Sequence, residues 1–300
     1  MIHGEGEAEE IAIERLRQPW LRGCDIRDDS LHDHSDLPNQ TRTLPIRGLA
    51  GKAILVTGSS TGIGFAMAER LVAEGARVLI HGRDAAEVDA AVAKLGAAAA
   101  GATGDLAEPA TAQAIVDATI AAFGRIDGLV NNAGIYPRGI LTETTATFFD
   151  HIFAINTRAP LLCAEAAIRA FRAQKSPGAI VTVGSINAYC GLSNLTVYSM
   201  SKGALMTMTR NLANTLGPER IRANQLNVGW TWTANEDATQ QREGRKPGWQ
   251  NHLPLRDAPT GRIMQPEEIA AHTAFWLSED SAPVSGQIYE AEQFPVIGRG

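Results

Sequence analysis

The 300-residue sequence has few of the features that mark disulfide-bonded, zinc-binding or membrane proteins. Its three cysteines, Cys24, Cys163 and Cys190, are far apart and show no CxxC spacing, which argues against a disulfide framework or a zinc knuckle and favours a reducing compartment. Hydrophobic residues make up 44% of the chain but form no run long enough to span a bilayer. We therefore expect a soluble globular protein that is not inserted in a membrane.

Neither sign of charge dominates, because 27 Lys and Arg residues are interspersed with 33 Asp and Glu residues, for a net charge of −6. No broad positive field is available to attract a polyanion, so nucleic acid is not an expected partner. The first residues include Glu5, Glu7, Glu9 and Glu10, where a secretory signal needs positive charge before an apolar stretch. The expected location is the cytoplasm.

Residues 1–48 differ from the rest of the chain, because they are acidic and contain prolines and only a short apolar patch. We interpret them as an N-terminal arm without regular structure, followed by a single domain over residues 49–300. Four residues of the arm are of types that bind metals: His32, Asp33, His34 and Asp36. They lack the i, i+4 or CxxC spacing of metal sites, so a solvated loop is expected and no metal site is predicted.

From Lys52 onward, short apolar segments alternate with longer segments of helical pattern. This alternation predicts an α/β fold, with a doubly wound parallel sheet of seven strands and helices on both faces. The expected strands are Ala53 to Thr57, Arg77 to His81, an alanine-rich one ending near Gly104, Ile126 to Asn131, Ala179 to Gly184, Ile221 to Val228 and Gly286 to Glu290. The expected helices are Ile63 to Glu74, Ala85 to Leu95, Pro109 to Phe123, Thr145 to Gln174, Val197 to Leu216 and Pro266 to Leu277.

A glycine-rich segment, Thr57-Gly58-Ser59-Ser60-Thr61-Gly62-Ile63-Gly64, joins the first expected strand to an amphipathic helix. Glycine allows a tight turn at position 58, and at positions 62 and 64 it lets a pyrophosphate approach the free amides and positive dipole of the helix start. The alternative is a turn that merely joins strand to helix. The TGxxxGxG spacing departs from the common GxGxxG pattern and resembles that of the short-chain dehydrogenase/reductase family.

The end of the second strand bears on the choice of dinucleotide. Gly82 occupies the position where an NAD-specific site has a carboxylate for the ribose 2′-hydroxyl. Arg83 follows it and can pair with the 2′-phosphate of NADP, whereas Asp84 is expected to cap the next helix. NADP(H) is therefore favoured over NAD(H), and the alternative is that Arg83 is a solvated surface charge.

Two further segments match the family. Asp105 corresponds to the residue that meets the adenine ring, and Asn131-Asn132-Ala133-Gly134 matches the NNAG motif that stabilises the sheet and lines the cofactor cleft. The resemblance implies a cofactor site made of Gly58, Ser60, Thr61, Gly62, Ile63, Gly64, Arg83, Asp105, Leu106, Asn132, Ala133, Gly134, Tyr198, Lys202, Gly229 and Thr231.

Tyr198 and Lys202 lie four residues apart at the start of an expected helix, so their side chains share one face. A phenol normally titrates near pH 10, and a neighbouring ammonium favours the phenolate and brings its pKa towards the working range. YxxxK alone occurs by chance in many helices. Ser185, however, precedes Tyr198 by the family's spacing of thirteen residues, and Asn156 is a polar residue in an apolar helix that needs buried partners.

Taken singly, each of these residues has an ordinary alternative: Lys202 on a helix surface, Tyr198 as a core aromatic and Ser185 as a turn hydroxyl. The resemblance covers about residues 49–290. It implies a Rossmann-type fold and an NAD(P)-dependent oxidoreductase that interconverts a secondary alcohol and a ketone. In that reaction Tyr198 would transfer the proton, Ser185 would hold and polarise the substrate oxygen, Lys202 would also bind ribose hydroxyls, and Asn156 would hold a water linking Lys202 to solvent.

Family members are commonly tetramers, so a homotetramer or homodimer built on the helices at 145–174 and 197–216 is expected. One alternative function is a non-catalytic dinucleotide-binding sensor or regulator on the same fold. Another is an epimerase or dehydratase, which would normally show a GxxGxxG segment and a longer C-terminal substrate domain.

The connection at 229–265 is long and holds Trp230, Trp232 and Trp249 among acids and amides. We interpret it as a lid over a sugar, polyol or hydroxy acid, with the rings covering C–H faces. A subunit contact is the alternative. The candidate substrate residues are Tyr136, Arg138 as a clamp for a carboxylate, Asn187, Tyr189 and Trp230. Two segments depart from the family: Val228-Gly229 replaces Pro-Gly, and the ending at Glu290-Ala291-Glu292 lacks the usual Asp-Gly-Gly.

Overall fold

The structure, a computed structural model, describes residues 46–296. The predictions for the N-terminal arm, including Cys24 and the histidine–aspartate cluster at 32–36, therefore fall almost wholly outside the described residues. The last residues of the expected arm that are described pack on the domain. Ile46 N–H donates to Glu74, and Arg47 forms an ion pair with Asp280.

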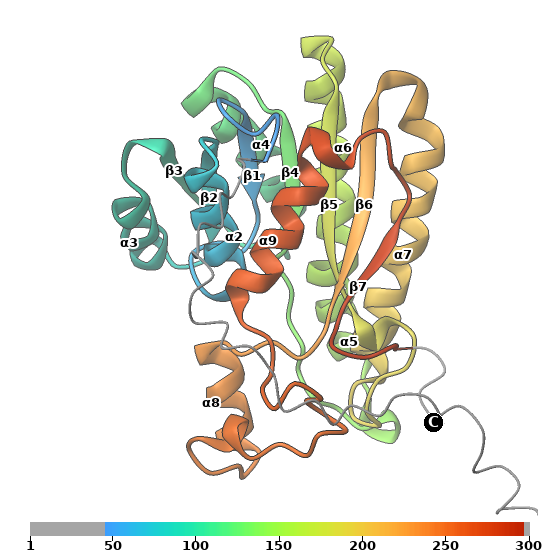
Figure 1. Cartoon of the computed structure of the whole chain (residues 1–300). Helices are drawn as coiled ribbons and strands as arrows, with labels where there is room; N and C mark the ends of the chain where they lie inside the picture. The colour runs from blue at the N-terminus through green and yellow to red at the C-terminus, as the bar shows by residue number, and fades with distance from the viewer. Residues whose placement is uncertain (1–45, 297–300) are drawn as a thin grey trace, which may run out of the picture. The chain divides into compact units, whose positions relative to one another are not determined.

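Seven parallel strands form a single sheet (Figure 1), which confirms the predicted fold class. The strands are β1 (Ala53–Val56), β2 (Arg77–Gly82), β3 (Ala99–Thr103), β4 (Gly128–Asn131), β5 (Gly178–Ser185), β6 (Ile221–Val228) and β7 (Ile288–Ala291). Their order is β3-β2-β1-β4-β5-β6-β7. The chain therefore proceeds from β1 to one edge of the sheet, returns to the middle at β4, and proceeds from there to the other edge. Sheets of this kind bind ligands outside the carboxyl ends of the strands, at the point where the order reverses.

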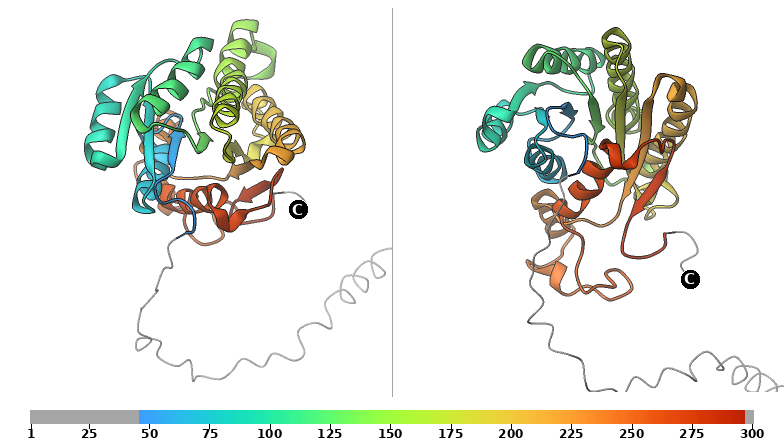
Figure 2. Two further views of the ribbon diagram at one scale, coloured as in Figure 1. Left: turned by 90° about the horizontal axis from the view of Figure 1, so that it is seen from above. Right: turned by 45° about the horizontal axis from the view of Figure 1, so that its top comes forward.

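Helices cover both faces of the sheet (Figure 2). The helices are α2 (Gly62–Ala73), α3 (Ala85–Leu95), α4 (Pro109–Phe123), α5 (Ala146–Phe153), α6 (Ala159–Gln174), α7 (Thr196–Leu216), α8 (Ala234–Arg242) and α9 (Pro266–Leu277). One apolar cluster joins α2, α3 and α9 to the sheet, and a second joins α4, α6 and α7 to its other face. β1, β4 and β5 are buried at every residue, which explains their continuous apolar sequences.

Four elements differ from the sequence-based expectation by more than one residue. The helix expected over 145–174 is divided by a π-helical turn, Ala154–Arg158, which contains Asn156. The helix α8 was not predicted, although Thr233 and Glu236 have the spacing of a capping box and the Thr233 hydroxyl accepts from the Glu236 N–H at 3.0 Å. β4 begins at Gly128 rather than at Ile126, and β7 begins at Ile288 rather than at Gly286.

Residues 46–296 lack two further features, a membrane-spanning helix and a cluster of metal-binding side chains. No helix there is both long and apolar enough to cross a membrane. The same residues contain no group of three or more His, Cys, Asp or Glu side chains that could hold a metal ion.

Candidate active site

The turn between β1 and α2 lies at the carboxyl edge of the sheet, beside the start of the loop after β4. Gly58 has a φ of 60°, and a Cβ added to it would lie 2.9 Å from the Ala133 Cα. A Cβ on Gly64 would collide with the Gly58 carbonyl and the Asn132 amide. Glycine at these positions therefore lets the turn, the first residues of α2 and the NNAG segment pack against one another.

The start of α2 fits an anionic group. Thr61 is the N-cap, yet its side chain forms no capping hydrogen bond, and the first turn contains no acidic residue. The first amides of the helix thus keep their unsatisfied donors and the positive end of the helix dipole, with no carboxylate of that turn to repel an anion. This arrangement is suited to the pyrophosphate of a dinucleotide.

Thr57 connects this turn to the end of β4 by hydrogen bonds, a role that the sequence analysis missed. Its Oγ1 accepts from the N–H groups of Asn132 and Ala133, both at 3.0 Å. The Asn132 side chain donates in turn to the carbonyls of Thr57 and Gly58, both at 2.9 Å. The glycine-rich turn and the NNAG segment therefore form one hydrogen-bonded unit.

Ser185, Tyr198, Lys202 and Asn156 come from three elements that meet beside this unit. Ser185 is the last residue of β5, and the Tyr198–Lys202 pair lies in the first two turns of α7. The Lys202 Nζ donates to the Val183 carbonyl at 2.9 Å and lies 5.9 Å from the centre of the Tyr198 ring. A Cβ on Gly134 would lie 3.3 Å from the Lys202 Nζ and 3.4 Å from the Asn156 Oδ1, so the NNAG glycine also reaches this point.

The side chain of Asn156 is fully buried in the π-helical turn and is held by protein groups on both ends. Its Oδ1 accepts from the Ile135 N–H at 2.8 Å, and its Nδ2 donates to the Ile135 carbonyl at 2.8 Å and to the Ser201 Oγ at 3.1 Å. Ser201 in turn donates to the Tyr198 carbonyl at 2.7 Å. The Asn156 amide therefore positions both the loop after NNAG and the start of α7. Sequence reasoning gave no role to Ser201.

Burial governs the titration of the two central groups. It raises the pKa of the Tyr198 phenol, and the hydrogen bond with Ser185 opposes this rise. Of the smaller influences, Tyr136 and Glu236 raise the Tyr198 pKa and Arg138 lowers it. Burial also lowers the pKa of Lys202 to about 8. The Tyr198 phenol is therefore neutral at neutral pH, and its pKa is shifted upward, whereas the charge of Lys202 alone was expected to shift it downward.

Two of the expected substrate residues link the loop after β4 to α8. The Tyr136 ring lies edge-on to Tyr198 with centroids 6.4 Å apart, and its hydroxyl accepts from the Asn235 Nδ2 at 2.8 Å. Arg138, expected to clamp a substrate carboxylate, instead pairs with Glu243 at 2.8 Å. These contacts place α8 across the carboxyl edge of the sheet, below the strands in Figure 1.

The tryptophans of the segment 229–265 pack against each other within it. Trp230 stacks on Trp249 at 5.1 Å, and Arg245 lies 5.3 Å from the centre of each ring. Trp232 packs on the same small core. The Trp230 Nε1 donates to Glu236 at 2.9 Å. Most of this aromatic surface therefore stabilises the segment 229–265 itself, which leaves less of it to cover a sugar than the sequence suggested.

The remaining expected substrate residues lie after β5. The Asn187 N–H donates to the Ser185 Oγ at 3.1 Å, whereas the Tyr189 side chain is exposed. Asn187 therefore contacts Ser185 through its backbone.

The residues after β2 and β3 were expected to contact the adenosine end of a dinucleotide. Asp84 caps α3 by accepting from the N–H groups of Ala86 and Glu87, as expected. Arg83 is exposed and has no hydrogen bond or ion pair with any other residue in 46–296. Among the other expected cofactor residues, the carboxylate of Asp105 accepts from the Ala107 N–H at 2.8 Å, and Leu106 is buried.

Two cofactor residues were expected after β6. The Gly229 N–H donates to the Ala291 carbonyl at 2.9 Å, and the buried Thr231 donates through its hydroxyl to the Gly229 carbonyl at 3.2 Å. Both therefore lie where β6 leaves the sheet and the segment 229–265 begins.

A family model described as enoyl-(acyl carrier protein) reductase matches residues 58–292, which include the glycine-rich turn, the NNAG segment and the Tyr198–Lys202 pair. The chain belongs to the short-chain dehydrogenase/reductase family. It is thus an oxidoreductase of a family that acts on alcohol or ketone groups with a nicotinamide dinucleotide.

Similar members of the family act on different compounds. Galactitol 2-dehydrogenase of Agrobacterium fabrum is 30% identical over 248 residues, which cover 81% of this chain and 97% of that protein. Levodione reductase of Leifsonia aquatica is 33% identical over 251 residues, covering 81% and 94%. The crystal structure of 3-ketoacyl-(acyl-carrier-protein) reductase from Brucella melitensis, complexed with NADH, matches with a TM-score of 0.72 and 29% identity, and covers 81% of this chain and 98% of that one.

Proposed function

We propose that this chain is an NADP(H)-preferring enzyme that interconverts a secondary alcohol and its ketone. The observation that carries the proposal is the convergence of Ser185, Tyr198 and Lys202 beside a glycine-rich turn suited to a dinucleotide. The cytoplasm is the proposed location. Cys163 and Cys190, the two cysteines within residues 46–296, are both free, as a reducing compartment would leave them.

In the proposed mechanism the cofactor supplies or accepts a hydride at its nicotinamide ring. The Tyr198 hydroxyl gives the proton to the substrate oxygen during reduction and takes it back during oxidation. Ser185, which hydrogen-bonds to that hydroxyl, holds and polarises the same oxygen. Lys202 stabilises the transient phenolate with its charge and binds the ribose hydroxyls. Asn156 positions α7 through Ser201 and so sets the place of both residues.

For the substrate we propose a polyol or sugar, with a hydroxy acid as the second choice. Two observations support a polyhydroxylated molecule: the similarity to a galactitol dehydrogenase, and the polar groups of Tyr136, Asn235 and Glu236 at the lid. The pairing of Arg138 with Glu243 makes a carboxylate clamp less available. At least one compound in a panel of polyols and sugars should be oxidised with NADP⁺. Absorbance at 340 nm measures the NADPH that this oxidation forms. Activity confined to apolar ketones would contradict this choice.

Arg83 should determine the preference for NADPH, because its guanidinium is exposed, has no hydrogen-bond or ion-pair partner within residues 46–296, and can form charge-assisted bonds with the 2′-phosphate. Gly82 before it has no room for a side chain, since an added Cβ would lie 2.7 Å from the Ser60 Oγ. We expect Arg83→Ala to weaken NADPH binding about tenfold or more, the worth of one or two such bonds. NADH binding should not change.

Fluorescence titration with both dinucleotides measures this effect. Arg169→Ala is a suitable control, because Arg169 is an exposed arginine on α6 with its partners on α6 and α4. An Arg83→Ala protein that still prefers NADPH would show that another group reads the phosphate.

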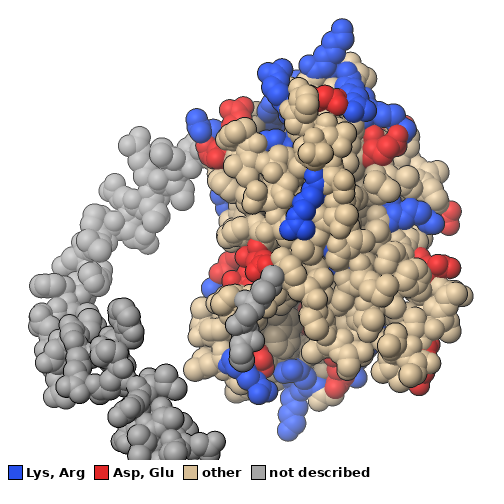
Figure 3. Space-filling model, turned by 90° about the vertical axis from the view of Figure 1, so that its right-hand side faces the viewer, with Lys and Arg blue, Asp and Glu red and all other residues tan. Residues whose placement is uncertain are grey.

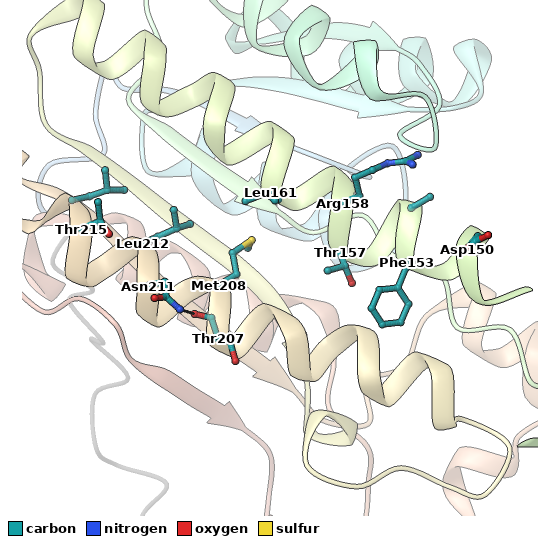
Figure 4. A pocket seen from close by; sticks show the side chains of 12 residues that line it. Asp150, Phe153, Thr157, Arg158, Leu161, Thr207, Met208, Asn211, Leu212 and Thr215 are labelled. Carbon is teal, nitrogen blue, oxygen red and sulfur yellow. Dashed lines mark hydrogen bonds between the residues drawn. The ribbon is translucent and has the colours of Figure 1, made fainter. Parts of the chain in front are cut away.

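We propose that the protein forms a homodimer or homotetramer through α6 and α7. An apolar groove of about 710 Å³ lies between α5, α6 and α7 and is lined by Phe153, Leu161, Met208 and Leu212 (Figure 4). Leu161 is 49% exposed. Figure 3 shows that the side of the molecule carrying α7 has few charged side chains across its middle. A second copy of the chain offers the same apolar face and would cover this one.

The substitution Leu161→Arg tests this interface, because a symmetric contact places the new charge in it twice. We expect the molar mass measured by size-exclusion chromatography with light scattering to fall to that of a smaller oligomer or of the monomer. Leu255→Arg, on an exposed leucine of the lid, should leave the mass unchanged. An oligomer unaffected by Leu161→Arg would place the contact elsewhere.

A further inference from the structure

We infer that His81 is a positioning residue for the dinucleotide: its neutral imidazole holds the Gly58 turn in shape, so that protonation of the ring weakens cofactor binding. The inference rests on the proposal that the cofactor binds at this turn. It assigns a role to a side chain near the end of β2, behind the turn, which sequence reasoning did not single out.

The His81 residue connects the loops after β1 and β3. Its side chain is 2% exposed. The ring Nδ1 accepts from the Gly58 N–H at 3.2 Å, and the ring Nε2 lies 3.1 Å from the carbonyl oxygen of Gly104. The backbone adds two bonds, because the His81 N–H donates to the Ser59 Oγ at 3.0 Å and the His81 carbonyl accepts from the Ser59 N–H at 2.8 Å.

These partners define the state of the ring. A backbone amide can only donate and a carbonyl can only accept, so Nδ1 must be the acceptor and Nε2 must carry the hydrogen. Only the neutral imidazole satisfies both bonds. A second proton, on Nδ1, would face the Gly58 N–H and replace a hydrogen bond by two opposed donors. Gly58 N–H forms no other hydrogen bond within residues 46–296, so the turn has no substitute for this contact.

The surroundings of His81 favour the neutral ring. Burial lowers the His81 pKa, whereas the Gly104 carbonyl and the Asp105 carboxylate raise it by smaller amounts. β3, the β1–α2 turn and the start of α2 consist of uncharged residues, and Glu108 lies at the start of α4, which packs on β2. Within residues 46–296, Asp105 is the one charged group that shifts the His81 pKa. Its carboxylate also accepts from the Ala107 N–H. The ring therefore stays neutral at neutral pH and gains its proton only on acidification.

The consequence for binding follows from linkage. If the bound state needs the neutral ring, affinity is constant above the pKa of His81 in the free protein and falls below it, by about tenfold per pH unit at the limit. The opposite pH dependence would have a different physical cause. A cationic ring that simply attracted the pyrophosphate would make binding tighter at low pH.

Calorimetric titration with NAD⁺, from about pH 8 down to the lowest pH at which the protein stays folded, tests the inference. This dinucleotide is chosen because it lacks the 2′-phosphate, whose second ionisation lies near pH 6 and would confuse the result. Weaker binding on acidification is the expected result. Affinity that is constant over the range, or that rises at low pH, would overturn the inference.

Two substitutions separate the ring's contacts. In His81→Asn the side-chain amide can occupy the place of Nδ1 and still accept from the Gly58 N–H, whereas in His81→Gln it reaches towards Gly104 and leaves Gly58 without an acceptor. We expect the Asn variant to bind NAD⁺ nearly as well as the unmodified protein at neutral pH. The Gln variant should bind about tenfold more weakly, the worth of one lost hydrogen bond to a buried amide. Neither should show the pH dependence.

Thermal melts in the absence of dinucleotide show whether each variant is folded. An Asn variant with the original pH dependence would assign the titration to another group and overturn the inference. Binding of NAD⁺ without pH dependence would contradict the role of His81 alone. Failure of NAD⁺, NADH and NADPH to bind at any pH would contradict the proposed function as well.

Discussion

Replacing Tyr198 by phenylalanine should reduce turnover by about three orders of magnitude, within the range expected for loss of a general acid–base group. The ring stays in place, so packing against Tyr136 is retained, and only the hydroxyl beside Ser185 disappears. Cofactor affinity should change little, because the glycine-rich turn and Lys202 are untouched. Steady-state kinetics and a fluorescence titration with NADPH measure the two effects separately.

Tyr136→Phe is the matched control, since it removes a second phenol hydroxyl a short distance away. That hydroxyl accepts from Asn235 of the lid, so its loss should raise KM for the substrate and leave kcat largely intact. A Tyr198→Phe protein with unreduced turnover would show that another group transfers the proton. A chain whose biological output survives this substitution would behave as a dinucleotide sensor.

Replacing Lys202 by methionine should abolish activity and yet stabilise the fold at neutral pH. Lys202 is 4% exposed, and burial lowers its pKa from 10.5 to about 8. This shift corresponds to a cost of about 3 kcal/mol for keeping the ammonium buried. The lost hydrogen bond to the Val183 carbonyl offsets about 1 kcal/mol of the gain. Denaturant unfolding at neutral pH should therefore show a net increase of about 2 kcal/mol.

The pH dependence of this gain has a definite sign. Between about pH 8 and 10.5 the unfolded chain binds more protons at Lys202 than the folded one, so the stability of the unmodified protein rises with pH in this window. The methionine variant lacks this increase, and its advantage should disappear by about pH 10.5. Lys202→Arg, which keeps the charge, should show no gain. A methionine variant that is less stable at neutral pH would mean that the ammonium is better solvated than its burial indicates.

The parts of the site that sequence could predict are those carried by local patterns. Ser185, Tyr198 and Lys202 lie at a strand end and a helix start, so a parallel sheet brings them to one edge once the strands are recognised. Asp84 was correctly expected to cap α3 for the same reason, since a cap depends on adjacent residues. The strands β1, β4 and β5 were found because buried parallel strands have continuous apolar sequences, whereas β3 and β7 are only partly buried and carry a weaker signal of this kind.

The parts that sequence could not predict depend on contacts between distant segments. Arg138 pairs with Glu243, 105 residues away, and this partner became visible only when α8 was placed. The tryptophans of the lid looked like exposed rings, because a sequence does not show that Trp230 and Trp249 stack on each other. The π-helical turn at Asn156 escaped notice because its residues continue a helical pattern.

The most direct test of the proposed oxidoreductase follows the hydride itself. NADPH carrying deuterium at both hydrogen positions of C4 of the nicotinamide would be incubated with the protein and a panel of sugar- and polyol-derived ketones. The masses of the products would be measured by mass spectrometry. We expect an alcohol with one deuterium at the new carbinol carbon, and no such product with the Tyr198→Phe protein. Tight binding of NADPH without deuterium transfer to any ketone would contradict the proposal and favour a sensor built on the same fold.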